Sequence, residues 1–146
     1  MFEKILYPTD FSDVSKKALD YIKQLKDAGT KEVVALHTLD IREIAGLFGD
    51  EGTYVNVEEV KKKWEQGAKK KIKAVETQLK KSGFKVKVRL ERGIPFKDIL
   101  RVEQEENVSV VVIGSHGKSC VEEMLLGSCS EKVIRKSTKP VLVVRR

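Results

Sequence analysis

The sequence predicts an α/β fold built on a parallel five-stranded sheet with helices on both faces. Two observations predict it. Short, β-branched apolar runs alternate along the chain with longer segments whose apolar residues recur every three or four positions. Most of the short runs are apolar throughout, which is typical of parallel strands that are covered on both faces. Strands and helices that alternate in this way form a doubly wound sheet with right-handed crossovers.

Five segments have the composition of strands. Residues 4–7, 32–37 and 108–113 are nearly continuous apolar runs, and Val141–Val144 forms a fourth run near the end of the chain. Residues 85–90 instead alternate polar and apolar side chains. Alternation indicates a strand with one exposed face, so we expect this strand nearer an edge of the sheet.

The first two helices are predicted from their apolar spacing and their ends. Ser12 is a candidate N-cap for a helix that Gly29 would end in a left-handed conformation. Residues 57–79 repeat apolar side chains at steps of three or four, with Trp64 on that apolar stripe, and Gly83 follows them. We therefore expect a long helix with one buried face.

Two more helices and one irregular segment complete the prediction. Pro95 suits the first turn of a third helix. Ser128 and Glu131 have the spacing of a capping box, which predicts that Ser128 caps the last helix. Residues 40–56 contain three glycines and are predicted to be an irregular, mobile loop. No linker or repeat divides the chain, so residues 1–146 are expected to form one domain.

The composition excludes several classes of protein. No uncharged apolar stretch approaches the roughly 18 residues that a membrane helix needs, and the N-terminus lacks the anatomy of a signal peptide. Cys120 and Cys129, with only His37 and His116, match neither a disulfide scaffold nor a zinc pattern. We therefore expect a cytoplasmic protein with reduced thiols and no membrane contact, and we expect His37 to be a satisfied core or edge histidine.

The net charge of +7 raises the question of nucleic-acid binding. Many lysines lie in residues 61–81, but glutamates interleave with them and they share a helix with a buried stripe. No aromatic platform accompanies them, because Trp64 belongs to the apolar stripe. The pattern favours a solvated helix face over a nucleic-acid surface.

A glycine pattern near the end of the chain is the sharpest functional signal. Gly114 and Gly117 follow a predicted buried strand, and Gly127-Ser128 comes nine residues later at a helix start. Glycines permit positive φ and close approach of the backbone to a phosphate, and a helix N-terminus attracts anions. The alternative is structural: the first two glycines could make a tight turn, and Ser128 could serve only as a cap. Residues 8–10 follow another strand end, where doubly wound folds bind ligands.

These segments together resemble the universal stress protein family. The resemblance rests on residues 4–12, on Gly114-Ser115-His116-Gly117 with Gly127-Ser128, and on residues 139–144, in the same order along the whole chain. The motif G-x-x-G-x9-G-[S/T] marks the ATP-binding branch of that family, and this sequence satisfies it without a gap. The resemblance implies a Rossmann-like sheet of order 3-2-1-4-5, bound ATP accompanied by Mg²⁺ or Mn²⁺, and a homodimer formed through Val141–Val144.

The resemblance also implies which residues contact the nucleotide. Asp10 and the backbone at Thr38 would hold adenine and ribose, although a carboxylate at Asp10 could instead cap the helix for which Ser12 competes. The glycine motif and the start of the last helix would surround ribose and phosphates. The full set of expected contacts is Pro8, Thr9, Asp10, Thr38, Ile113, Gly114, His116, Gly117, Gly127, Ser128, Cys129 and Ser130; no metal ligand is assigned.

The expected function is that of an ATP-dependent sensor or regulator in a stress response. The sequence contains no Gly-x-Ser-x-Gly elbow, kinase motif set or HExxH site, which argues against a dedicated hydrolase. The alternative is an enzyme that hydrolyses ATP slowly or transfers an adenylyl group at the same nucleotide site.

Overall fold

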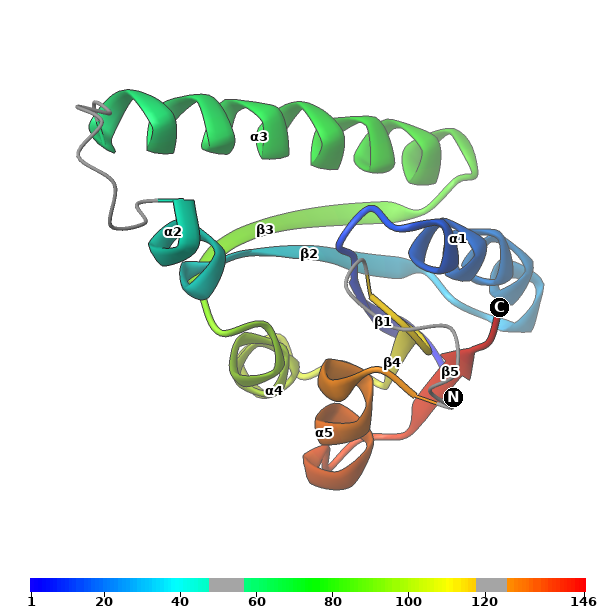
Figure 1. Ribbon diagram of the computed structural model, residues 1–146. Helices are drawn as coiled ribbons and strands as arrows, with labels where there is room; N and C mark the ends of the chain where they lie inside the picture. The colour runs from blue at the N-terminus through cyan, green and yellow to red at the C-terminus, as the bar shows by residue number, and fades with distance from the viewer. Residues whose placement is uncertain (48–56, 118–125) are drawn as a thin grey trace.

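A computed structural model describes residues 1–47, 57–117 and 126–146 of the chain. Its five strands form one parallel sheet in the order β3-β2-β1-β4-β5, as predicted (Figure 1). The strands are β1 (Lys4–Pro8), β2 (Glu32–Asp40), β3 (Lys85–Gly93), β4 (Val110–Gly114) and β5 (Val141–Val144). The alternating strand β3 lies at one edge of the sheet, as predicted, and β5 lies at the other.

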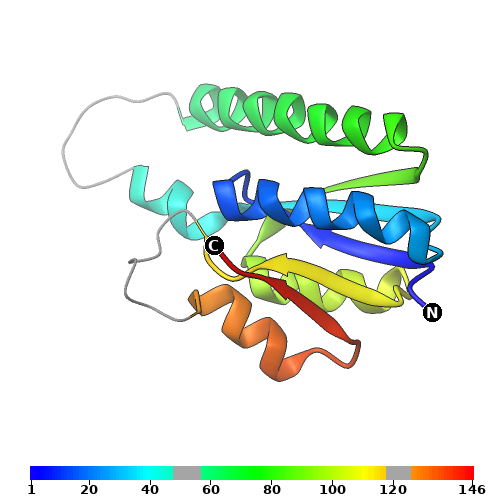
Figure 2. The ribbon, with the colours of Figure 1, turned by 90° about the vertical axis from the view of Figure 1, so that its right-hand side faces the viewer.

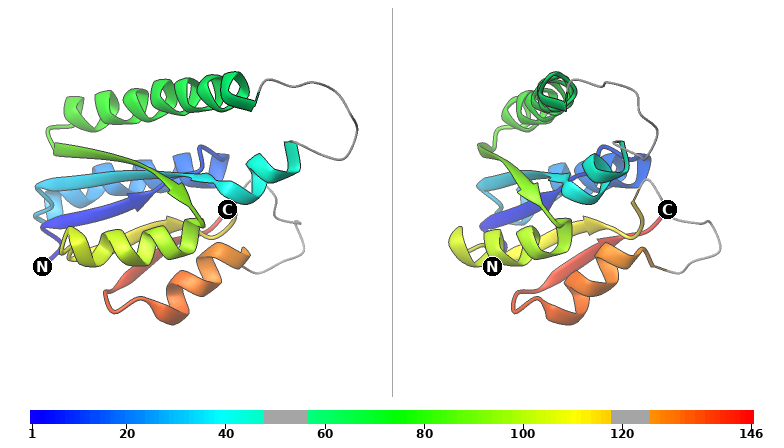
Figure 3. Two further views of the ribbon diagram at one scale, coloured as in Figure 1. Left: turned by 90° about the vertical axis from the view of Figure 1, so that its left-hand side faces the viewer. Right: turned by 60° about the vertical axis from the view of Figure 1, so that its left-hand side comes forward.

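Helices cover both faces of the sheet (Figure 3). They are α1 (Asp13–Leu25), α2 (Ile41–Leu47), α3 (Val57–Lys81), α4 (Pro95–Glu105) and α5 (Ser128–Lys136). One core joins the sheet to α1 and α3 through residues such as Ile5, Ile22 and Ile72. A second core joins the opposite face to α4 and α5. In the described part of the chain, no helix is both long enough and apolar enough to cross a membrane.

The segment after β2 differs from the prediction. β2 extends to Asp40, and Ile41–Leu47 form the short helix α2 where an irregular loop was expected. The Asp40 carboxylate accepts a hydrogen bond from the backbone N–H of Arg42 (2.9 Å), which satisfies a donor that the first turn leaves free. The prediction of a loop was wrong for residues 41–47, and residues 48–56 lie outside the described residues.

The predicted helix caps are confirmed for α1 and are wrong for α5. Ser12 caps α1 by accepting from the backbone N–H of Ser15 (3.3 Å), and Gly29 has the expected left-handed φ of 104° after a 3-10 turn that follows α1. The predicted cap at Ser128 is wrong. The N-cap of α5 is Gly127, whose carbonyl accepts from the backbone N–H of Glu131 (2.9 Å), and no side chain in the described part of the chain caps this helix.

Candidate functional site

A cleft opens at the carboxyl ends of β1, β2 and β4, where the order of the sheet changes direction. Every predicted contact residue lines this cleft except Gly127 and Ser128. Parallel α/β sheets bind their ligands at such a switch point, because the loops after neighbouring strands diverge there and leave a crevice. The fold therefore brings the two motifs from opposite ends of the chain to one place.

The loop after β1 is held in shape by its own side chains. The Thr9 hydroxyl accepts from the backbone N–H of Phe11 (3.0 Å) and from the Ser15 hydroxyl (2.6 Å). The Asp10 carboxylate accepts from the backbone N–H of Ser12 (3.0 Å) through Oδ1. Phe11 has a φ of 65°, a conformation that costs a bulky residue energy and that clusters at functional sites. These bonds position Asp10 at the mouth of the cleft.

The three motif glycines are required by close approach rather than by positive φ. A Cβ at Gly117 would lie 2.9 Å from Oδ2 of Asp10, and a Cβ at Gly127 would lie 3.3 Å from the α-carbon of His116. A Cβ at Gly114 would lie 2.9 Å from Cγ1 of Val14 on α1. Gly114 thus serves packing of β4 against α1, whereas Gly117 and Gly127 draw the loop after β4 against its neighbours.

The start of α5 is fixed to the loop after β4. The backbone N–H of Gly127 donates to the carbonyl of Ser115 (2.7 Å), and the Ser130 hydroxyl donates to the carbonyl of Gly114 (2.7 Å). Ser128 is the first residue of α5, is exposed, and does not cap the helix. The N–H groups of the first turn and the helix dipole favour an anion at this end. Since Ser128 has no capping role, the structural explanation for this serine no longer applies.

His37 and Thr38 lie next to each other on β2 but differ in their hydrogen bonding. The His37 ring donates from Nδ1 to the carbonyl of Thr9 (2.7 Å) and packs on Phe11 at 4.5 Å between ring centroids. His37 is therefore a satisfied histidine, as predicted. The Thr38 hydroxyl is buried and has no partner among the described residues. A buried hydroxyl without a partner is rare in proteins, so a ligand or water is the group expected to satisfy it.

Sequence reasoning missed Arg42 and its partner Asp40, both of which line the cleft. Arg42 donates from Nε and from a terminal nitrogen to the two oxygens of Asp40 (2.9 and 2.7 Å). These hydrogen bonds hold the pKa of the Asp40 carboxyl below its usual value. An Asp-x-Arg spacing after a strand was the available signal, but three nearby glycines had suggested a loop.

Trp64 is a second residue whose position was not predicted. It lines the cleft from α3, together with Pro95 at the start of α4 and Glu43 of α2. The spacing of apolar residues in the sequence placed Trp64 on the apolar stripe of this helix. That spacing does not indicate that the Trp64 part of the stripe faces a cleft instead of the sheet. Only the packing of α3 on β2 and β3 brings Trp64 there.

Cys129 lines the cleft as a protonated thiol. Burial, and secondarily the negative charge of Asp10, raise its pKa to about 11. A thiol with this pKa is a poor nucleophile at neutral pH, because the thiolate is the reactive form. Cys120 lies outside the described residues, and within residues 1–47, 57–117 and 126–146 no three His, Cys, Asp or Glu side chains form a metal-binding group.

Comparison with known proteins assigns this architecture to a family. The model of the universal stress protein family matches residues 1–145. The chain is 43% identical over 156 residues to universal stress protein MJ0577 of Methanocaldococcus jannaschii, covering 100% of this chain and 96% of that protein. The solved structure of MJ0577 matches with a TM-score of 0.90 at 42% identity, over 100% of this chain and 97% of that one.

Two further relatives extend the comparison. Universal stress protein YxiE of Bacillus subtilis is 32% identical over 153 residues, covering 99% of this chain and 100% of YxiE. A universal stress protein from Archaeoglobus fulgidus, solved in complex with dAMP, has the same fold at 20% identity, with a TM-score of 0.63 over 99% of this chain and 98% of that one. The protein therefore belongs to the universal stress protein family.

Proposed function

We propose that the cleft binds an adenine nucleotide, ATP foremost, and that the protein acts as a nucleotide-dependent sensor or regulator in a stress response. The observation that carries the proposal is the meeting of two loops: residues 9–12 after β1, here called the Asp10 loop, and residues 115–117 after β4, here called the Gly117 loop. Oδ2 of Asp10 lies against the backbone of Gly117. The carboxylate offers an acceptor for the hydroxyl or amine groups of a nucleoside. The glycine loop and the start of α5 offer backbone N–H groups for phosphates.

The proposed contacts divide the cleft into two parts. Pro8, Thr9, Asp10 and the backbone of Thr38 contact the nucleoside, and Trp64 offers an aromatic surface beside it. The ribose and phosphates are surrounded by residues of the glycine motif and of the start of α5: Ile113, Gly114, His116, Gly117, Gly127, Ser128, Cys129 and Ser130. The Ser130 hydroxyl already donates to Gly114, so its role is to hold α5 rather than to bind the ligand directly.

The charge of the cleft bears on the form of the ligand. Among its described lining residues, Asp10, Asp40 and Glu43 are acidic, and Arg42, which is paired with Asp40, is basic. A triphosphate in such surroundings needs a cation to offset its charge. Since the described residues do not form a metal-binding group, we expect Mg²⁺ or Mn²⁺ to enter with the phosphates rather than on protein ligands.

The comparisons support a nucleotide without deciding which one. The Archaeoglobus fulgidus protein was solved with dAMP, an adenine nucleotide, on the same fold. The decisive experiment is mass spectrometry of the small molecules released from freshly purified protein, followed by calorimetric titration with ATP, AMP and GTP. ATP as the released nucleotide and as the tightest ligand supports the proposal, and failure of all three nucleotides to bind refutes it.

A regulatory role requires that the nucleotide binds two conformations with different affinity. Helix α2 is the element to follow, because it carries Arg42 and Glu43 into the cleft. We expect ATP to slow amide hydrogen exchange in residues 41–47 more than in α1. Equal protection of the two helices would argue for a nucleotide-binding protein that has no conformational response at α2.

We also propose a homodimer formed through β5. This edge strand pairs with β4 on one side (Figure 2). The side chain of Leu142 on this strand is 40% exposed. The carbonyls of Pro140 and Val144 accept from the backbone N–H groups of Val111 in β4 and Ser115 just after it. The alternate residues Val141 and Val143 therefore present their backbone groups to the open side. Antiparallel pairing of two β5 strands about a two-fold axis would satisfy these groups in both copies.

A further inference from the structure

A second hollow lies on the opposite side of the Asp10 loop, between α1 and α3. It has a volume of about 470 Å³, which is within the range of small-molecule sites. Its origin is the way the two helices cover the sheet: α3 packs mainly on β2 and β3, whereas α1 packs mainly on β4 and β5. The strip of sheet between the helices, over β1, is left as a groove, hereafter the α1–α3 groove.

The walls and floor of the α1–α3 groove are largely apolar. Phe11, Leu19 and Val75 contribute apolar side chains, and Tyr7 lies buried beneath them. The Tyr7 hydroxyl donates to the carbonyl of Ser15 (2.6 Å), so the polar group at the floor is already satisfied. A ligand for this groove must therefore have an apolar portion.

Two lysines face the groove from opposite walls. Lys16 lies on α1 and Lys71 on α3, and neither forms a salt bridge within the described residues. The Lys71 ammonium lies 5.7 Å from the centre of the Phe11 ring, which places it over the groove. Asp20 on α1 also lines the groove, and its carboxylate lies 3.9 Å from the ammonium of Lys23. Among the described lining residues, two cations, Lys16 and Lys71, therefore stand against one carboxylate, and the groove carries a net positive charge.

We propose that the α1–α3 groove binds a small amphipathic anion, a carboxylate with a single hydrocarbon chain. The chain lies on Leu19 and Val75, and the carboxylate lies between the ammonium groups of Lys16 and Lys71. A nucleotide does not fit this description, because no glycine is among the described lining residues of the groove and its lysines, Lys16 and Lys71, lie at exposed positions. The site is distinct from the nucleotide cleft, and its occupation does not depend on the function proposed for that cleft.

The test is a titration of the intact protein with sodium octanoate, followed by amide chemical shifts and by calorimetry. We expect saturable binding with the largest shifts at Leu19, Ala74 and Val75. Lys16→Met or Lys71→Met should each weaken octanoate binding by roughly threefold to tenfold. The matched controls Lys17→Met and Lys70→Met remove the same charge one residue away on the same helices and should leave the affinity unchanged.

Two further measurements decide between this ligand and other occupants. 1-Octanol, which has the same chain without the charge, should bind more weakly than octanoate. Ala74→Phe places a ring in the groove and should abolish octanoate binding without altering the mass in light scattering. The proposal fails if octanoate shifts Gly114–Gly117 instead of the groove, if the control variants lose as much affinity as the test variants, or if Ala74→Phe changes the oligomeric state.

Discussion

The backbone of Gly117 lies directly against the carboxylate of Asp10, so that a Cβ on Gly117 would stand 2.9 Å from Oδ2. The two residues come from motifs near opposite ends of the chain and meet at the carboxyl ends of β1 and β4. Any side chain at position 117 must displace the Asp10 carboxylate before it contacts a ligand. The glycine is thus needed for the position of the carboxylate as well as for access of phosphate to the backbone.

Substitution of Gly117 should therefore act partly through Asp10. We expect Gly117→Ala to weaken ATP binding roughly tenfold, or about 1.4 kcal/mol. In an Asp10→Ala background the same change should cost less than about threefold, because the oxygen that the new methyl group displaces is gone. Calorimetry on the four proteins of the cycle measures this coupling. Equal losses in both backgrounds would show that Gly117 acts independently of Asp10; Gly67→Ala, which meets no atoms within 4 Å, is the neutral control.

Asp10 should contribute to the nucleoside rather than to the phosphates. We expect Asp10→Ala to weaken ATP and AMP by the same factor, because both share adenosine. Asp10→Asn retains an oxygen that can accept from Ser12, so it separates the loss of charge from the loss of the loop bond. Asp13→Asn is a control that removes a nearby charge from the exposed start of α1. A loss confined to metal-dependent ATP binding would assign Asp10 to the cation instead.

Cys129 reports on the cleft through its reactivity. In a Cys120→Ser variant, its alkylation by iodoacetamide should be slow at pH 7 and should rise roughly tenfold per pH unit toward pH 10, because its pKa is raised to about 11. Asp10→Asn should speed the reaction, since the charge of Asp10 contributes to the raised pKa. Bound ATP should slow it by covering the thiol. Mass spectrometry of the intact protein follows the rate, and no effect of ATP would place the nucleotide away from Cys129.

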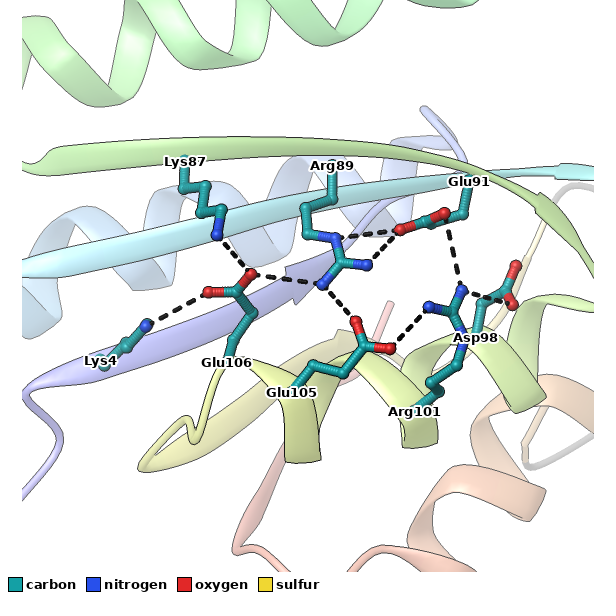
Figure 4. Close-up of polar contacts among 8 residues, drawn as sticks. All are labelled: Lys4, Lys87, Arg89, Glu91, Asp98, Arg101, Glu105 and Glu106. Carbon is teal, nitrogen blue, oxygen red and sulfur yellow. Dashed lines mark hydrogen bonds and ion pairs between the residues drawn. The ribbon is translucent and has the colours of Figure 1, made fainter.

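An ion-pair network joins the edge strand β3 to α4 (Figure 4). Glu106 is central to it: its carboxylate contacts Lys87 (2.7 Å), Arg89 (3.3 Å) and Lys4 (3.4 Å), and its side chain is 9% exposed. Glu105 continues the network to Arg101, and the side chains of Glu91 and Asp98 complete it. The network holds β3 to α4, and α4 contributes Pro95 and Ile99 to the cleft.

The network predicts a defined response to acid. The hydrogen bond from Lys87, followed by that from Lys4, lowers the pKa of Glu106 below its usual 4.5. A carboxyl whose pKa is lower in the folded state stabilises the fold above its unfolded pKa, and this contribution is lost as the pH falls through the folded value. We therefore expect the free energy of unfolding to decrease below about pH 4.5.

The variant Glu106→Gln isolates this contribution. It should lower the free energy of unfolding at pH 7 by about 1–3 kcal/mol, since it leaves three cations with a weaker partner. The difference from the unmodified protein should be smaller at pH 3, where the Glu106 carboxylate is more protonated than at pH 7. Urea unfolding at the two pH values tests this. Glu131→Gln, whose pair with Arg135 is solvent-exposed, should change stability little at either pH.

The proposed dimer can be tested at one backbone group. Val143→Pro removes an N–H that faces the open edge of β5, and it leaves the bonds to β4 intact because those use alternate residues. We expect a dimeric mass for the unmodified protein in light scattering and a monomeric mass for the variant, with an unchanged ATP affinity. A monomeric mass for the unmodified protein at micromolar concentration would overturn the dimer.

The pattern of neighbouring residues in the sequence was enough to predict the strands and several of the helix ends. Continuous apolar runs identify strands that are covered on both faces, and alternating polar and apolar residues identify β3 as an edge strand. Both patterns can be recognised from consecutive residues alone. Ser12, Gly29 and Gly83 mark helix ends through bonds or φ angles that involve near neighbours in the chain. The family resemblance added the strand order. These features needed no knowledge of which segments meet.

Only the tertiary structure determines which residues line the cleft and why the α1–α3 groove exists. Arg42 and Trp64 enter the cleft because β2 is longer than its apolar run and because α3 packs on β2 and β3. The N-cap of the last helix is Gly127 rather than Ser128, and the backbone N–H of Gly127 is bonded to the carbonyl of Ser115 on a different segment. The α1–α3 groove exists because two helices cover separate halves of one sheet. Such features depend on contacts between residues far apart in the chain, and local spacing does not encode which of those contacts form.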